Sequence, residues 1–90
     1  MKKVNLNTVI INENDERVFQ NVQNLQFENT GTSAVFVNNK KILPGKKLLV
    51  NTNFAINELH LKIEFDGENT SDNMLEFTFL HIEEVVNNCN

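Results

Sequence analysis

The chain of 90 residues contains little of several residue types. It has one proline, three glycines and one cysteine, and it lacks tryptophan and tyrosine. The single cysteine, Cys89, excludes a disulfide within the chain and a zinc site built from several cysteines. The absence of tryptophan and tyrosine argues against a carbohydrate-binding platform, because sugars usually stack on exposed rings that also carry a polar edge.

Long hydrophobic runs and an excess of positive charge are also missing. No apolar run approaches the roughly 18 residues that a membrane-spanning helix needs, and Lys2 and Lys3 are not followed by the apolar stretch of a secretory signal. The formal net charge is −4, whereas general nucleic-acid binding needs a basic surface or stripe. We therefore expect neither a membrane segment nor a nucleic-acid partner.

The hydrophobic content nevertheless predicts a folded core. Valine, isoleucine, leucine and phenylalanine supply 31 of the 90 residues, well above the roughly 20% below which chains are typically disordered. We expect a single domain over residues 1–90, with a frayed tail over residues 84–90. A domain of this size buries only about 60% of the surface of its unfolded chain, so a partner or an oligomer would add stability.

Asparagine is unusually frequent, with 17 copies in the chain. Asparagine tolerates left-handed backbone and caps turns through its side chain, so it can stand where glycine is usual. The asparagines are scattered rather than clustered, which argues against a prion-like tract and favours a bias toward AT-rich codons.

The dominant hydrophobic period is two residues, which is typical of strands with one face on a core. Apolar and polar residues alternate over residues 58–65 and 75–79. A polar segment, residues 66–73, separates these two runs, and we predict that they form a long antiparallel hairpin. A further strand is expected over residues 3–11, where one face carries Val4, Leu6, Thr8 and Ile10.

The segment over residues 16–24 fits two structures. Val18, Val22 and Leu25 have the spacing of a helical face, with Asp15 as the N-cap. The same segment fits a strand whose frame shifts between Val22 and Leu25, as a β-bulge allows. We favour the strand.

Two turn signals follow in the middle of the chain. Residues 34–37 are apolar on both faces, which predicts a central, buried strand. Asn38-Asn39 then fits a tight turn that requires positive φ, and Pro44-Gly45 fits the central positions of a type II turn. Another strand is expected over residues 46–50.

The chain therefore contains about seven short strands at a spacing of about ten residues. This pattern predicts an all-β protein, an antiparallel β-sandwich of immunoglobulin-like or jelly-roll type. A small barrel is the alternative, because the strand pattern does not separate the two.

Residue types that bind metals or carry acid–base catalysis are few. His60 and His81 fall on opposite faces of the predicted hairpin, which argues against a shared metal ion. The acidic loop over residues 66–72 lacks the glycine and the bidentate glutamate of a calcium-binding loop. Glu64 and Glu76 are predicted to face each other on the solvated side of the hairpin, where no pocket would raise the pKa of either carboxyl group.

Nucleophiles are equally isolated. Ser33 and Ser71 lie in turn sequences without the Gly-x-Ser-x-Gly setting of a catalytic serine, and Cys89 has no base in view. We expect a protein that is not an enzyme and that uses no cofactor, metal ion or small-molecule substrate.

Half of the eight basic residues lie in one short segment. Lys40, Lys41, Lys46 and Lys47 bracket an Ile-Leu-Pro-Gly sequence, and two turns would bring these lysines to one end or edge of the sandwich. Lysines on an edge strand prevent unwanted strand pairing. The alternative is a docking patch for an acidic surface. The sequence leaves both interpretations open.

Three motifs follow one another within residues 25–50. They are the turn Asn29-Thr30-Gly31, the strand Val35-Phe36-Val37-Asn38 and the segment Leu43-Pro44-Gly45. This succession resembles a recurrent segment of small β-sandwich proteins of phage particles, although those proteins usually have Asn-Gly where this chain has Asn38-Asn39. With its Asn- and Lys-rich composition, the chain is similar to the auxiliary capsid and tail-accessory proteins of tailed phages infecting gut bacteria, the crAss-like group among them.

The resemblance implies a structural protein of the virion, assembled in the host cytoplasm, and it implies no catalytic residues. We expect an auxiliary capsid (decoration) protein that stabilises the shell by adhesion to the major capsid protein or other virion proteins. The four lysines would make this contact. The alternatives are a neck or tail accessory protein, a carbohydrate- or protein-binding module of another class, and a phage-encoded regulatory protein.

Overall fold

The computed structural model describes residues 2–66 and 72–84, and these residues form an all-β fold without an α-helix. Every strand pairing is antiparallel, as the sequence predicted. The seven strands are β1 (Lys2–Ile11), β2 (Asp15–Asn29), β3 (Val35–Val37), β4 (Lys40–Ile42), β5 (Lys47–Val50), β6 (Ile56–Phe65) and β7 (Leu75–Glu84). The described residues contain no helix that could cross a membrane.

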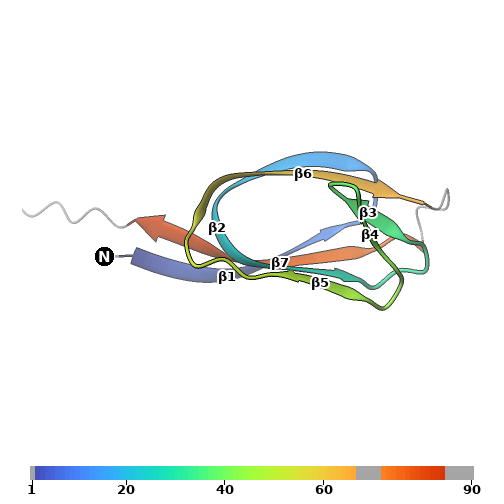
Figure 1. Cartoon of the computed structure of the whole chain (residues 1–90), viewed down its shortest axis with the longest axis horizontal. Coiled ribbons are helices and arrows are strands. Elements are labelled where there is room, and N and C mark those ends of the chain that lie inside the picture. The colour runs from blue at the N-terminus through green and yellow to red at the C-terminus, as the bar shows by residue number, and fades with distance from the viewer. Residues whose placement is uncertain (1, 67–71, 85–90) are drawn as a thin grey trace, which may run out of the picture.

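The strands form two layers that share one strand, β2. The first half of β2 pairs with β6, whereas the second half pairs with β7 on one side and with β5 on the other. One layer is therefore β2–β6–β3–β4, and the other is β1–β7–β2–β5. Figure 1 shows the two layers facing each other, with β6 in one and β7 and β5 in the other. This arrangement is a β-sandwich.

The curvature of β2 comes from two asparagines. Asn21 and Asn24 have φ angles of 56° and 54°, a left-handed conformation that asparagine adopts more readily than most residues. The register between β2 and β7 shifts between Gln23 and Gln26. The predicted strand with a β-bulge is thus confirmed, and the helical alternative for this segment is wrong. The bulge lets one strand leave the first layer and enter the second.

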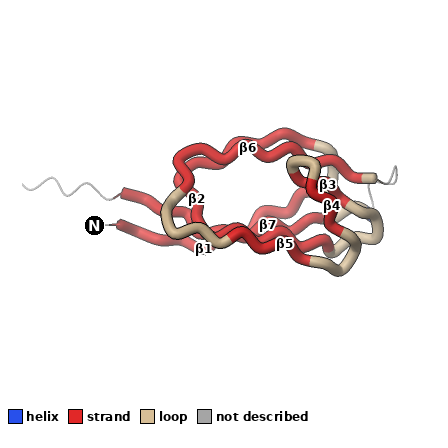
Figure 2. Tube along the Cα trace, viewed as in Figure 1, coloured by secondary structure: helices blue, strands red, loops and turns tan. Residues whose placement is uncertain are grey.

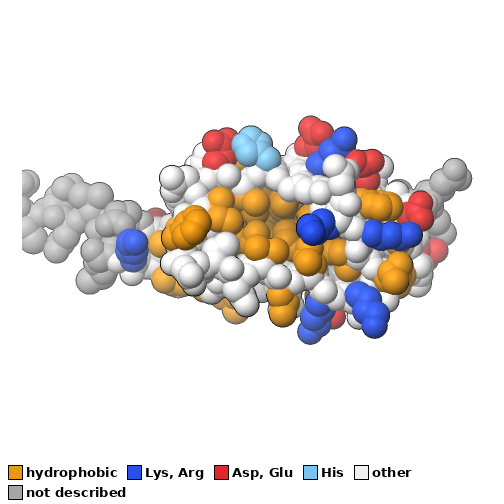
Figure 3. All heavy atoms as spheres, in the orientation of Figure 1, with side chains coloured by type: hydrophobic (Ala, Val, Ile, Leu, Met, Phe, Trp, Pro, Cys, Tyr) orange, Lys and Arg blue, Asp and Glu red, His pale blue; other side chains and the backbone are white. Residues whose placement is uncertain are grey.

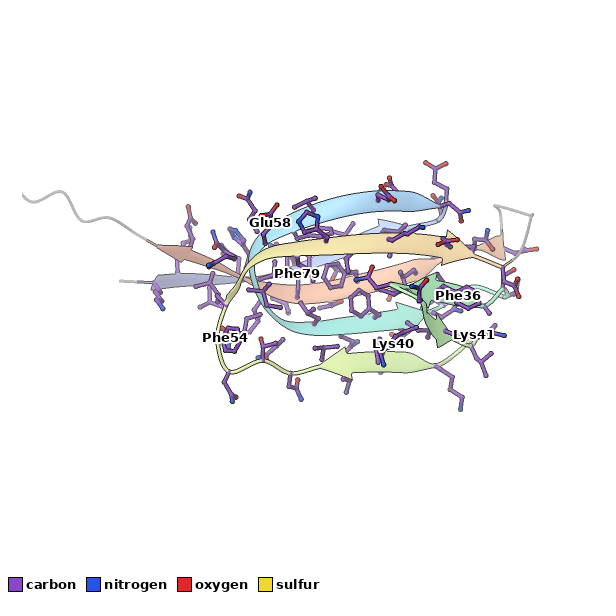
Figure 4. The ribbon with its side chains drawn as sticks, turned by 45° about the horizontal axis from the view of Figure 1, so that its top comes forward. Phe36, Lys40, Lys41, Phe54, Glu58 and Phe79 are labelled. Atoms are coloured by element: carbon purple, nitrogen blue, oxygen red, sulfur yellow. The ribbon has the colours of Figure 1, made fainter. Side chains whose placement is uncertain are left out.

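The inner faces of the two layers enclose a phenylalanine cluster. Phe77 is fully buried, and its ring centroid lies 4.6 Å from that of Phe27, 4.7 Å from that of Phe79 and 5.1 Å from that of Phe19. Figure 4 shows Phe79 between the layers. Offset and edge-on rings of this kind add stability beyond the area that they bury. This cluster holds the two layers together.

The predicted hairpin of residues 58–65 and 75–79 is wrong. The two segments lie in β6 and β7, but β6 pairs with β2 and β3, whereas β7 pairs with β1 and β2. They belong to opposite layers. Alternation fixes which face of a strand is buried, and packing face to face across a sandwich satisfies it as well as hydrogen-bonded pairing does.

The turns in the middle of the chain have the predicted conformations. Asn38 and Asn39 have φ angles of 48° and 69°, and Gly45 has a φ of 80°. The Lys46 amide donates to the Leu43 carbonyl at 3.0 Å, which closes the predicted type II turn. The loops and turns gather mostly at the two ends of the sandwich (Figure 2).

Two further predictions concern β3 and the C-terminal end. β3 is central, between β6 and β4, but Phe36 at its middle is half-buried on the outer face instead of lying in the core. The expected frayed tail began too early, because β7 continues through Glu84. The rest of that tail, residues 85–90, lies outside the described residues.

Candidate functional site

The four lysines of the 40–47 segment lie along one side of the sandwich. β4, which carries Lys40 and Lys41, is the edge strand of one layer, and β5, which begins at Lys47, is the edge strand of the other. Lys46 lies in the turn between them. All four side chains are exposed, and Figure 4 shows Lys40 and Lys41 on β4 above β5. We call this side the lysine edge.

An apolar groove opens between the two layers along the lysine edge. Its volume is about 240 Å³. Side chains of β2, β3, β5 and β6 form its walls, and Lys40 and Asn38 supply its polar rim. In Figure 3 the hydrophobic side chains form a continuous hollowed area between the layers, with Lys or Arg side chains beside it. The lining residues are Leu25, Phe27, Val37, Asn38, Lys40, Leu48, Val50, Ile56, Leu59 and Leu61.

The side chain of Asn38 fixes the β3–β4 turn to the neighbouring strand. Its amide group donates to the His60 carbonyl at 2.9 Å, and its Oδ1 accepts from the Lys62 amide at 2.7 Å. The backbone amide of Asn38 also donates to the Lys62 carbonyl, at 3.0 Å. These bonds continue the β3–β6 pairing for one more residue. They hold the start of β4, and therefore Lys40, at the rim of the groove.

Asn29 anchors the other end of the lysine edge. It is fully buried, and its side-chain amide donates to the Ser33 carbonyl at 2.8 Å and to the Ile42 carbonyl at 2.9 Å. Its backbone bonds to the β4–β5 turn through the Lys46 carbonyl, at 3.0 Å, and the Gly45 amide, at 2.8 Å. One residue, through its side chain and its backbone, thus ties the end of β2 to the segment that carries the lysines.

The positive charges of the lysine edge are not neutralised within the described residues. None of the four lysines lies within 4.0 Å of a described carboxylate. The Lys41 ammonium lies 5.8 Å from the centroid of the Phe36 ring, a cation–π contact that leaves its charge exposed. Four unpaired charges along an edge that also opens into an apolar groove make this edge a candidate binding surface for an acidic, partly apolar partner.

Two other basic residues, Arg17 and Lys62, have carboxylate partners. The Arg17 Nε donates to the Asp15 Oδ2 at 2.7 Å, and Lys62 lies 3.4 Å from Glu64. The hydrogen bond from Arg17 lowers the pKa of Asp15 below its ordinary value of 3.8. The pairing of these residues distinguishes them from the lysine edge.

The residues considered for metal binding or acid–base chemistry are dispersed. His60 is exposed on the outer face of β6, 3.0 Å from Glu58, whereas His81 is half-buried in β7, opposite Val22 of β2. Glu64 and Glu76 do not face each other as predicted, because β6 and β7 lie in opposite layers. Across the described ranges no three His, Cys, Asp or Glu side chains gather as metal ligands.

Several other candidates lie partly or wholly outside the described residues. The acidic loop considered for calcium has its middle, residues 67–71, outside them, and that stretch contains Ser71. Cys89 lies outside them as well. Ser33 is half-buried in the turn before β3, where its carbonyl accepts from Asn29.

The sequence predicted the gathering of the lysines but not the elements that hold them. Asn29 and Asn38 carried a local signal, since both stand at turns in a chain with few glycines. Their partners in β4 and β6 are 13 to 24 residues away, and no local pattern indicates such contacts. The groove forms between the two layers, and the alternation of apolar residues does not indicate which strands share a layer.

The fold and the lysine edge define an antiparallel β-sandwich with a basic, groove-bearing edge. No family model, curated protein or solved structure matches the chain.

Proposed function

We propose that the chain is an auxiliary capsid (decoration) protein, which binds and stabilises a phage shell by adhesion. The observation that carries the proposal is the lysine edge, where four unpaired lysines lie along one side of the sandwich and one of them, Lys40, lines an apolar groove. The resemblance of residues 25–50 to small virion proteins supplies the class of partner.

The lysine edge suits a shallow contact with an acidic protein surface. The lysines attract carboxylates on the partner and speed the encounter. The groove accepts one or two apolar side chains, and Phe54 is exposed toward the far end of the same side (Figure 4). Such a contact is weak for one copy. Across the repeated subunits of a shell, many weak contacts clamp neighbouring subunits together.

Quantitative mass spectrometry of density-purified particles of the source phage tests the proposal. We expect a copy number close to that of the major capsid protein. A handful of copies per particle would replace decoration by a neck, vertex or tail role. Absence from particles would overturn the virion proposal and would favour a regulatory or other binding protein.

A charge variant tests the role of the lysine edge. Changing Lys40, Lys41, Lys46 and Lys47 to Gln should abolish co-sedimentation with particles while the melting temperature stays nearly unchanged, because all four side chains are exposed. The matched control places the same net charge elsewhere, with Asp or Glu at four exposed positions: Asn12, Gln20, Asn53 and Asn57. The control should co-sediment normally. Equal co-sedimentation of both variants would show that the lysines serve edge protection alone.

A further inference from the structure

The opposite edge of the sandwich carries a long strand whose outer side is unpaired. β1 pairs with β7 over ten consecutive positions, from Lys2 opposite Glu84 to Ile11 opposite Leu75. No other described strand pairs with it. Ten residues of strand span roughly 33 Å. Alternate backbone amides and carbonyls along this length point outward without a strand partner.

The features that usually protect an edge are missing from most of β1. Residues 4–11 contain no charge, proline or glycine, and the register with β7 has no bulge. The outward face exposes Val4, Leu6 and Ile10, with 71% of Leu6 accessible to solvent. This apolar face continues onto β7, because Val4 lies opposite Ile82 and Leu6 opposite Leu80.

We propose that β1 is a self-association edge, at which two copies of this chain pair antiparallel to form a symmetric dimer. A strand edge is completed by another strand, and a two-fold axis lets the same edge serve both copies. The two β1–β7–β2–β5 layers then join into one continuous antiparallel sheet. This interface lies on the edge opposite the lysines and does not depend on the proposed shell contact.

Charge complementarity selects one register for the pair. With Thr8 on the two-fold axis, Leu6 of each copy lies opposite Ile10 of the other. The same register carries Lys3 of each copy past the end of the other β1, toward the bend over residues 12–14 that contains Glu13, so opposite charges meet at both ends of the dimer. A shift to an axis at Asn7 would place Lys3 beside Ile11. The register at Thr8 therefore satisfies both the apolar and the charged positions.

Sedimentation equilibrium of the full chain tests the dimer. We expect the wild type to dimerise with a dissociation constant below about 1 mM. Leu6→Lys should raise this dissociation constant at least about tenfold. The matched control is Leu49→Lys on β5. Leu49 is 59% exposed and lies on the same face of the same layer at its other edge, in line with Gln26, Thr78 and Thr8. This control should dimerise like the wild type.

A charge swap tests the register and remains informative if Leu6→Lys does not fold. Lys3→Glu and Glu13→Lys should each weaken the dimer, and the double variant should restore it. A wild type that stays monomeric overturns the proposal, and so does equal weakening by Leu6→Lys and Leu49→Lys. A double variant as weak as the single ones overturns the register at Thr8. Circular dichroism of each variant confirms that it is folded.

Discussion

The two edges of the sandwich differ in length and in charge. The lysine edge consists of two short strands, β4 with three residues and β5 with four, and carries four lysines in or beside them. The β1 edge has ten residues, and its last eight are uncharged. Edge lysines protect long, flat and apolar strands from unwanted pairing. Here the edge in greatest need of protection has its lysines only at one end.

This difference bears on the interpretation that the sequence left open. If the four lysines served protection alone, their natural place would be along β1. They lie instead in or beside short strands that offer few unpaired backbone groups, and one of them, Lys40, borders an apolar groove. This distribution of lysines favours docking of a different protein at the lysine edge and self-association of two copies of the chain through β1.

The largest expected effect on stability comes from removing Asn29, which anchors the lysine edge but does not pair with β1. Asn29→Ala deletes three side-chain hydrogen bonds: the amide no longer donates to the Ser33 and Ile42 carbonyls, and Oδ1 no longer accepts from the Gly31 amide. We expect a loss of about 3 kcal/mol in the free energy of unfolding, measured by urea denaturation. Asn7→Ala, at an exposed position of β1, should change the same quantity by less than about 0.5 kcal/mol.

The Asn29 variant also tests whether the edges are independent. Its folded fraction should dimerise through β1 like the wild type, because Asn29 lies on β2, which β7 separates from β1. If dimerisation were lost together with the stability of the lysine edge, the two edges would be coupled through the sheet, and the comparison between them would fail.

A smaller effect is expected at the turn that positions Lys40. Asn38→Gly keeps the positive φ but removes both side-chain bonds to β6, which should cost about 1–2 kcal/mol. Asn39→Gly has no such bond to lose and relieves the left-handed backbone, so it should stabilise by about 0.5 kcal/mol. Thermal unfolding should show a lower melting temperature for Asn38→Gly and a higher one for Asn39→Gly. Equal shifts would mean that the Asn38 bonds contribute nothing.

The smallest effect concerns a basic residue that, unlike the lysines, has a partner. The pKa of Asp15 should lie below 3.8 and should rise in Arg17→Gln, because the hydrogen bond from Arg17 favours the carboxylate. The pair stabilises the fold above the unfolded pKa, and this contribution is lost as the pH falls through the lowered folded pKa. Carbon-13 NMR titration of Asp15 measures the change. An unchanged midpoint in the variant would show that Arg17 does not hold the carboxylate.

The sequence was sufficient for features with local causes. Period-two alternation located the strands, and the turn at Asn38 and Asn39 and the bulge after Val22 followed from the backbone preferences of a few neighbouring residues. Strand partners were not predictable, because the buried faces of β6 and β7 satisfy the same pattern whether they pair or face each other. The sequence also did not indicate which face of β1 is buried, since Leu6 on one face and Ile11 on the other are both apolar.

The anchors of the candidate site, Asn29 and Asn38, were likewise not predictable from local sequence. A buried asparagine such as Asn29 has the same sequence signature as an exposed turn residue, and its carbonyl partners are main-chain groups that any residue provides. The lysines were found because their clustering is visible along the chain. Their separation from the β1 edge became visible only in the three-dimensional arrangement.

The sharing of β2 between the layers has a consequence for unfolding. Val22 pairs with Ile56 in one layer and with His81 in the other, so neither layer can separate without breaking the ladder of the other. The sandwich should therefore melt as one cooperative unit. The β2 amides that are hydrogen-bonded in the ladders should exchange with solvent only through global opening, whereas the short strand β4, paired on one side, should open locally far more often.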